Sequence, residues 1–315
     1  GCQVQAGGAT CLHQTFGVVE QHWIIGAWQM ELLIANLVNG ISWGMVLFLI
    51  ASGLSIVMGL MGITNLAHGA LYMVGAYVGW TIAVQFKMNF WLAVLLGGIG
   101  GAVVGLLIER VFLRRLYRQP NEQVLLTYGF VYILSNLIIW AWGGHRRLQF
   151  TDPMLFGSTE IGGMPFAKDR LAIIGIGVVV AVALWWLQDR TRVGAMVRAG
   201  MDDKEMTMCL GINLDLVFTG VFLLAAFIAG AAGVVGAQLL GAYSWLGTDI
   251  LLLALIVVVV GGLGSVQGSL VGGLAIGLID TFGKALFPQM AMFTIYLAMI
   301  VILLVKPSGL LGREV

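Results

Sequence analysis

The densest group of side chains that could do chemistry lies in a charged stretch, residues 189–213. This stretch is too charged to cross a lipid bilayer. Within it Val193, Val197, Met201 and Met208 fall near one helical face, which predicts a short amphipathic helix at the membrane surface. Two interpretations follow: a solvated loop that carries surface charge, or a segment that docks into a groove of a partner protein.

Nucleotide, metal and nucleic-acid chemistry find no support in the sequence. A P-loop needs Gly-x4-Gly-Lys followed by Ser or Thr, so that backbone amides and the lysine hold phosphates. The only Gly-Lys pair, Gly283-Lys284, is followed by Ala285 and lacks a glycine at the required spacing before it. The four histidines and three cysteines show no metal-ligand spacing. A formal charge of +1 gives no basic excess for binding nucleic acid. We therefore expect no catalytic residues, no metal and no cofactor held by this chain.

Composition assigns the chain to the membrane. Of its 315 residues, 60% are hydrophobic and 10% charged, against roughly 25% charged in a soluble domain. Uncharged windows separate the charges, and a helix needs about 20 apolar residues to cross a bilayer. We predict an all-α polytopic membrane protein with about eight to ten transmembrane helices, some of them broken or re-entrant.

Two glycine-rich places interrupt the apolar windows and mark candidate path residues. The first holds Asn65 and His68 in otherwise apolar sequence, and the second follows a short apolar run, 250–261. Such paired interruptions are typical of discontinuous helices around a transport path. Asn65 and His68 either line that path or are satisfied inside the helix packing. We predict a translocation path at the following residues: Asn65, His68, Gly69, Tyr72, Gly261, Gly262 and Gly264.

The positive charges set the predicted orientation. Cytoplasmic loops carry an excess of Lys and Arg. Ten of the sixteen basic residues fall on the side of the 189–213 stretch, and six fall on the other side. The ten are Arg110, Arg114, Arg115, Arg118, Arg190, Arg192, Arg198, Lys204, Lys306 and Arg313; the six are Lys87, Arg146, Arg147, Lys168, Arg170 and Lys284. The charged stretch is therefore expected in the cytoplasm and the 145–170 loop in the periplasm.

The chain divides into an N-terminal extension of unclear role, residues 1–29, and a transmembrane domain, residues 30–315. A glycine pattern beginning at Gly100 returns at Gly272, on spans that run in opposite directions. This echo is compatible with an inverted repeat, although glycine is common enough for a chance match.

Several motifs, in order along residues 30–315, resemble the permease subunits of branched-chain amino acid ABC importers (LivH-type). In the charged stretch they are Gly194, Arg198-Ala199, Asp202-Asp203, Glu205 and Leu210-Gly211-Ile212. Elsewhere they are Asn36 to Gly40, Asn65 to Gly69 with Tyr72 and Gly75, Val260 to Ser265, and the tail Lys306 to Arg313. Met206 and Met208 depart from the family pattern, which often has Ala there.

The resemblance implies a passive membrane half of an ATP-driven importer in the bacterial inner membrane. A partner ATPase would hydrolyse ATP with Mg and dock on the 189–213 stretch, for which the coupling residues are Arg192, Gly194, Arg198, Asp202, Glu205 and Gly211. A second, non-identical permease and a periplasmic binding protein complete the expected partners. The expected cargo is a small polar solute, above all a branched-chain or other hydrophobic amino acid. The alternatives are a urea or short-amide ABC permease, and an ATP-independent secondary transporter or channel.

Overall fold

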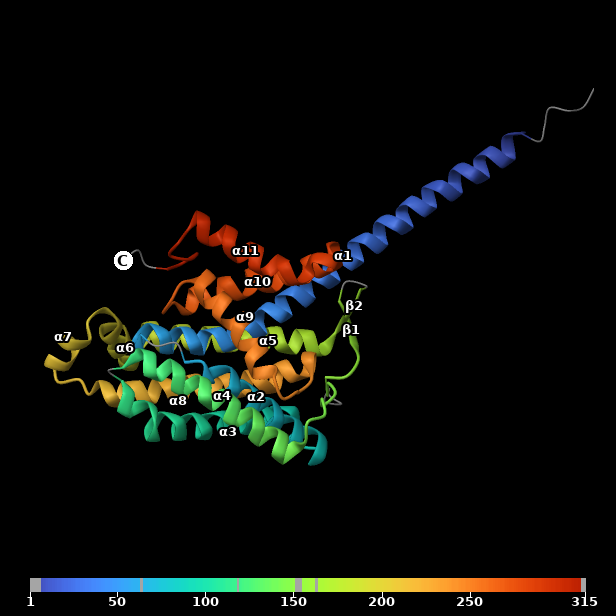
Figure 1. The fold of residues 1–315 in the computed structure, drawn as a ribbon. Helices are drawn as coiled ribbons and strands as arrows, with labels where there is room; N and C mark the ends of the chain where they lie inside the picture. The colour runs from blue at the N-terminus through green and yellow to red at the C-terminus, as the bar shows by residue number, and fades with distance from the viewer. Residues whose placement is uncertain (1–6, 63–64, 118, 151–154, 162–163, 313–315) are drawn as a thin grey trace, which may run out of the picture.

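In the computed structural model the chain is a bundle of helices with one small hairpin (Figure 1). The structure describes residues 7–62, 65–117, 119–150, 155–161 and 164–312. The helices are α1 (Gly7–Met61), α2 (Ala67–Trp80), η1 (Thr81–Gln85), α3 (Phe90–Val111), η2 (Leu113–Leu116), α4 (Pro120–Trp142), α5 (Lys168–Arg190), α6 (Arg192–Asp202), α7 (Lys204–Cys209), α8 (Leu214–Leu240), α9 (Leu246–Gly261), α10 (Val266–Leu286), η3 (Pro288–Met290) and α11 (Ala291–Val305). The strands β1 (Ser158–Ile161) and β2 (Met164–Ala167) pair antiparallel in the 145–170 loop.

Six helices among the described residues are long and apolar enough to cross a membrane. They are Glu31–Met61, Phe90–Val111, Pro120–Trp142, Lys168–Arg190, Leu214–Leu240 and Val266–Leu286. The segments Leu246–Gly261 and Phe293–Val305 are shorter apolar helices, and α2 continues into η1. The 16 residues of α9 rise only about 24 Å, less than the roughly 30 Å of a bilayer core. The predicted all-helical membrane class, with some short or broken spans, is confirmed.

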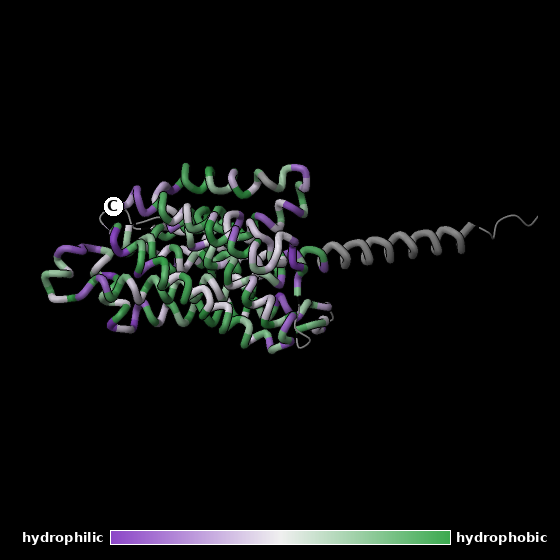
Figure 2. The backbone as a smooth tube through the Cα atoms, turned by 60° about the horizontal axis from the view of Figure 1, so that its bottom comes forward, coloured by the Kyte–Doolittle hydropathy of each residue, from purple (hydrophilic) through white to green (hydrophobic). Residues whose placement is uncertain are grey.

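The two ends of the bundle carry different loops. Figure 1 places α6 and α7 at one end and the β1–β2 hairpin at the other. In Figure 2 hydrophilic residues gather toward these ends, while the middle is mainly hydrophobic. Among the predicted cytoplasmic cations, Arg114 pairs with Asp215 at the start of α8, 3.1 Å away. Arg118 and Arg313 lie outside the described residues. The structure thus separates the 189–213 stretch from the 145–170 loop, as the charge pattern predicts.

Glycines let the helices approach at backbone distance. A methyl group placed on Gly75 of α2 would lie 2.1 Å from the carbonyl oxygen of Gly230 on α8. One placed on Gly277 of α10 would lie 2.4 Å from the Cα of Gly44 on α1. Small residues give such close contacts in membranes, where the hydrophobic effect does not drive helix association. The two echoing glycine patterns both serve this purpose, Gly101 against α8 and Gly273 against α1.

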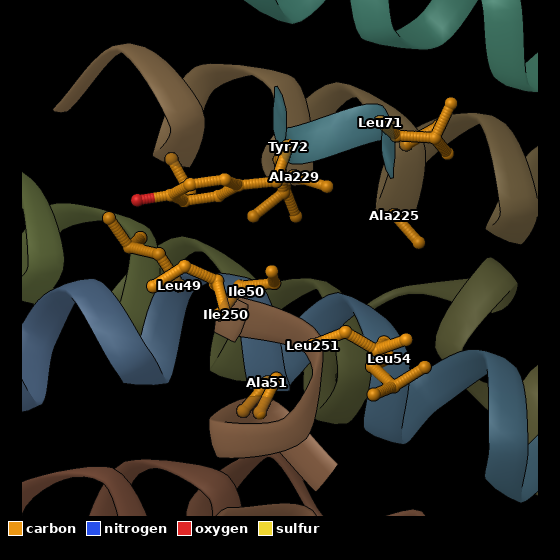
Figure 3. Packing of buried hydrophobic residues seen from close by; sticks show 14 of the residues in the cluster. Leu49, Ile50, Ala51, Leu54, Leu71, Tyr72, Ala225, Ala229, Ile250 and Leu251 are labelled. Carbon is orange, nitrogen blue, oxygen red and sulfur yellow. The ribbon is translucent and has the colours of Figure 1, made fainter. Parts of the chain in front are cut away.

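The core lies between α1, α2, α8 and α9. Figure 3 shows side chains from these four helices meeting, among them Leu49, Tyr72, Ala229 and Ile250. α1 runs from Gly7 to Met61 and so includes part of the predicted N-terminal extension; the division at residue 30 stays a prediction. Residues 1–6 of the predicted extension lie outside the described residues.

Candidate functional site

The 189–213 stretch, called the coupling segment from here on, folds as two short helices with side-chain caps. The Thr191 hydroxyl accepts a hydrogen bond from the Gly194 amide at the start of α6, 3.1 Å away. Asp203 does the same for the Met206 amide at the start of α7, 3.0 Å away. Such N-caps satisfy amides that a helix start leaves without partners. The caps thus mark α6 and α7 as two separate helices.

The Asp203 cap starts a new helix and changes the positions of some residues of the predicted amphipathic face. Val197 is 5% exposed and Met201 is half-buried, as expected of an inward face. Val193 and Met208, however, are exposed at 47% and 54%. Because the chain turns at Asp203 and starts a new helix, Met208 no longer follows the helical spacing set by Met201. The predicted short amphipathic helix is therefore present as α6, while the inclusion of Met208 in its apolar face was wrong.

Two of the predicted coupling residues hold the segment to α5. A methyl group placed on Gly194 would lie 2.2 Å from the carbonyl oxygen of Gln188, so the turn between α5 and α6 has room only for glycine. Arg198 donates to the same carbonyl, and its Nη1 lies 3.5 Å from Asp189 Oδ1. These residues position the segment.

The other four predicted coupling residues, Arg192, Asp202, Glu205 and Gly211, lie on the exposed surface of the segment. Gly211 has a φ of +82° and ends the turn after α7. Met206 and Leu210 are 61% and 73% exposed beside them. Sequence reasoning missed this apolar group, whose signal was the departure from Ala at positions 206 and 208. Large exposed apolar side chains among charges are typical of protein docking surfaces.

The inner side of the coupling segment reaches the end of α1. Lys204 Nζ lies 3.0 Å from the carbonyl oxygen of Met61, the last residue of that helix. A cation there satisfies a helix carbonyl and interacts favourably with the negative end of the helix dipole. Partial burial lowers the pKa of the Lys204 ammonium below its ordinary value.

The same place brings the two glycine-rich interruptions together. A methyl group placed on Gly59 of α1 would lie 2.6 Å from the Cα of Gly264 and 3.0 Å from the Cε of Met201 on α6. Gly262 and Gly264 have φ values of +105° and +76°, which favour glycine and end α9 before α10 begins. We call this contact of Gly59, Gly264 and Met201 the glycine junction.

The C-terminal tail is hydrogen-bonded to the end of α9, next to the glycine junction. The amides of Leu310 and Leu311 donate to the carbonyls of Val260 and Gly261, at 2.7 and 3.0 Å. Gly261 and Gly262 are buried there. The predicted path residues of this group therefore lie in a packed joint between α9, α10 and the tail.

The predicted path residues around α2 are also buried within the chain. Asn65 and His68 are 2% and 1% exposed, and Tyr72 is fully buried. The Asn65 Oδ1 accepts from the amide of Ala67 at 3.1 Å, and His68 Nε2 lies 3.2 Å from the carbonyl oxygen of Ile50. A methyl group placed on Gly69 would lie 2.1 Å from the carbonyl oxygen of Gly247. Ile63 and Thr64, directly before this motif, lie outside the described residues.

This helical, glycine-jointed membrane chain matches a known family over most of its length. Residues 36–304 match the family described as branched-chain amino acid transport system / permease component. The chain belongs to that family. The permease is thus a non-catalytic component of a transport system, as the motifs implied.

Individual relatives agree on the class and differ in cargo. The permease is 30% identical to the high-affinity branched-chain amino acid transport system permease protein LivH of Salmonella typhimurium, over 90% of this chain and 97% of that one. It is 29% identical to the corresponding BraD protein of Pseudomonas aeruginosa, over 88% and 95%. The ribose import permease protein RbsC of Escherichia coli is 28% identical over 75% and 71%.

Proposed function

We propose that this permease forms one half of the membrane core of an ABC importer and carries branched-chain or other hydrophobic amino acids. A periplasmic binding protein delivers the amino acid, and a second and similar permease completes the core. ATPase subunits dock on the coupling segment and hydrolyse ATP with Mg. The assembly lies in the bacterial inner membrane, with the coupling segment in the cytoplasm. The excess of Lys and Arg on the side of the coupling segment and the family membership support this arrangement.

One observation carries the coupling mechanism: the coupling segment touches both helix interruptions. Lys204 holds the last carbonyl of α1, and Met201 contacts Gly59 and Gly264. A displacement of α6 and α7 is therefore transmitted by direct contacts to the end of α1 and to the turn between α9 and α10. Glycines of positive φ at the α9–α10 turn supply a joint whose backbone has no Cβ to restrict it. The chain supplies a lever and a joint, while the energy comes from the partner ATPase.

The exposed side of the coupling segment suits the docking of that ATPase. Met206, Met208 and Leu210 offer exposed apolar surface, and the exposed Arg192 and Glu205 of the same segment carry opposite charges. A docking surface usually combines an apolar centre with a polar rim. Docking and transmission are thus assigned to opposite sides of the same segment.

Two substitutions separate these roles in the complex reconstituted with its ATPase, second permease and binding protein. Leu210→Glu places a charge in the apolar surface and should weaken retention of the ATPase by about tenfold. Lys204→Met keeps a flexible unbranched side chain, one atom shorter, but removes the charged donor; because Lys204 is exposed to solvent, the lost contact contributes about 1 kcal/mol or less. We expect Lys204→Met to retain the ATPase while amino acid transported per ATP falls severalfold.

Leu148→Glu is the matched control, because Leu148 is 82% exposed in the loop at the opposite end. It should leave both measurements unchanged. Normal transport per ATP in Lys204→Met would refute the transmission route. Uptake of leucine, ribose and urea by the unsubstituted complex, each with its binding protein, decides the cargo.

A further inference from the structure

A cavity of about 440 Å³ opens at the hairpin end of the permease, opposite the coupling segment. α1 contributes Asn36, Asn39 and Trp43 to its wall, α5 contributes Arg170, and α10 contributes Asp280 and Lys284. Small-molecule sites usually have volumes of about 300–1,000 Å³. The size and the number of polar groups are those of a site for a small molecule.

Two buried polar atoms of this wall lack partners among the described residues. Asp280 is only 3% exposed; its Oδ2 lies 2.6 Å from Lys284 Nζ, while its Oδ1 accepts no hydrogen bond. The Trp43 Nε1 donates to no acceptor. A buried polar atom without a partner costs about 1–3 kcal/mol, and such atoms in native structures are few. An unused acceptor and an unused donor thus lie within the wall of one cavity, where a polar ligand would supply the missing partners.

The wall offers both signs of charge. Asp280 supplies a carboxylate, while Arg170 and Lys284 supply cations whose side chains are 32% and 60% exposed. Asn36 and Asn39 add amides that can donate and accept. This set matches a molecule that carries an ammonium and a carboxylate together. Within the chain Lys284 already pairs with Asp280 Oδ2, and Arg170 lies 3.9 Å from Asp169 Oδ2, so a bound ammonium would add to the unpartnered Asp280 Oδ1 and a bound carboxylate to the exposed sides of the two cations.

The remaining wall is aliphatic and held in place. Leu239 and Leu240 at the end of α8 line the cavity. Two side chains of the 145–170 loop hold the backbone of these leucines. Arg146 donates a hydrogen bond to the carbonyl oxygen of Leu240 at 2.7 Å, and Gln149 donates one to the carbonyl oxygen of Leu239. An aliphatic side chain beside these leucines would be removed from water.

We propose that this cavity is a binding site for a zwitterionic amino acid with an aliphatic side chain, at the outer mouth of the permease. The ammonium pairs with Asp280, the carboxylate with Lys284 and Arg170, and the side chain packs on Leu239 and Leu240. The proposal rests on the amino-acid cargo proposed above and places recognition within the permease itself.

Equilibrium binding of radiolabelled L-leucine tests the site, with the full complex in nanodiscs of phosphatidylcholine and phosphatidylglycerol and no binding protein present. Asp280→Asn and Lys284→Gln should each weaken leucine binding by about tenfold or more, since each removes one charge-assisted contact. Lys284→Arg should retain binding. Glu160→Gln and Lys87→Gln are matched controls, because both residues are exposed away from the cavity wall. ATPase retention and basal ATP hydrolysis confirm that each variant is assembled.

Competitors test the chemistry. 4-Methylpentanoate lacks the ammonium of leucine and isoamylamine lacks the carboxylate, so neither should displace it. Displacement by either, or unchanged leucine binding in Asp280→Asn, would overturn the proposal. Nanodiscs with phosphatidylethanolamine test the other source of a paired ammonium and anion: if that lipid blocks leucine, the cavity holds a headgroup and the amino-acid site is wrong.

The outcomes separate this proposal from the proposed function. If leucine does not bind to the permease but is transported with normal ATP coupling, the cavity proposal fails and the importer function stands. If the complex transports ribose or urea and not leucine, the amino-acid cargo itself fails.

Discussion

Gly69→Ala distinguishes a packing role from a path role at a residue predicted to line the translocation path. The added methyl group would lie 2.1 Å from the carbonyl oxygen of Gly247 and 2.7 Å from the Cβ of Leu251, both on α9. Ordinary van der Waals contact begins at 3.4 Å, so α2 and α9 must separate by about 1 Å. The obstacle is backbone, which cannot rotate away as a side chain can.

The magnitude follows from this overlap. A separation of 0.5–1 Å forfeits a quarter to a half of the attraction at each contact that it opens, and overpacked cores lose about 1–3 kcal/mol. We expect Gly69→Ala to reduce the free energy of unfolding by about 2–3 kcal/mol. Gly129→Ala is the control: Gly129 lies within α4 with no atom within 4 Å of an added methyl group, so better helix propensity should stabilise the protein by up to about 1 kcal/mol.

Unfolding of the purified permease in mixed micelles, titrated with SDS, gives both free energies, and uptake by the reconstituted complex is measured in parallel. If Gly69 lines an open path, Gly69→Ala will be as stable as Gly129→Ala and only uptake will fall. That result would refute the packing assignment.

Three further predictions concern polar contacts near the membrane surfaces. Thr219→Val should cost about 1.5–3 kcal/mol in SDS unfolding, because Thr219 donates to the fully buried Glu109 carboxylate at 2.9 Å. Burial and the hydrogen bond to Glu109 raise the pKa of Tyr117, so stability should hold up to about pH 10 and fall above it, where only the unfolded state loses this proton; Tyr117→Phe should remove that fall. Trp142→Phe removes a 2.7 Å hydrogen bond from the indole to Thr81 and should cost about 0.5–1.5 kcal/mol by the same assay, whereas an unchanged midpoint would show that water replaces the bond.

Some features of the site could be predicted because they depend on local sequence. The glycines at 262 and 264 predicted a break, and the structure ends α9 there. The charges of the coupling segment predicted that it does not cross the bilayer, and the structure places α6 and α7 at one end of the bundle. The predicted short amphipathic helix forms as α6, but its apolar face does not extend to Met208, because Asp203 caps a new helix, a preference that competes with helical spacing.

Other features depend on which helices become neighbours, and spacing does not determine that. Asn65 and His68 left two interpretations open; burial against α1 came from the packing, and their role in transport stays a prediction. Lys204 is one of many surface cations until the end of α1 lies beside it. Nothing in the sequence around Asp280 indicates that Trp43, 237 residues earlier, shares its cavity.

The sequence by itself determined the membrane class of this protein, the glycine-rich breaks between its helices and its family, because hydropathy, charge and glycine act within a few residues of where they stand. It predicted about eight to ten membrane helices, whereas six long apolar helices and two shorter ones lie among the described residues. The tertiary structure decided that Gly59 of α1 packs against Gly264 with Met201 of α6 beside both. It also decided that α1, α5, α10 and the end of α8 line one charged cavity. Those contacts join residues far apart in the chain. They arise only when small residues let backbones approach closely enough for distant side chains to share one environment.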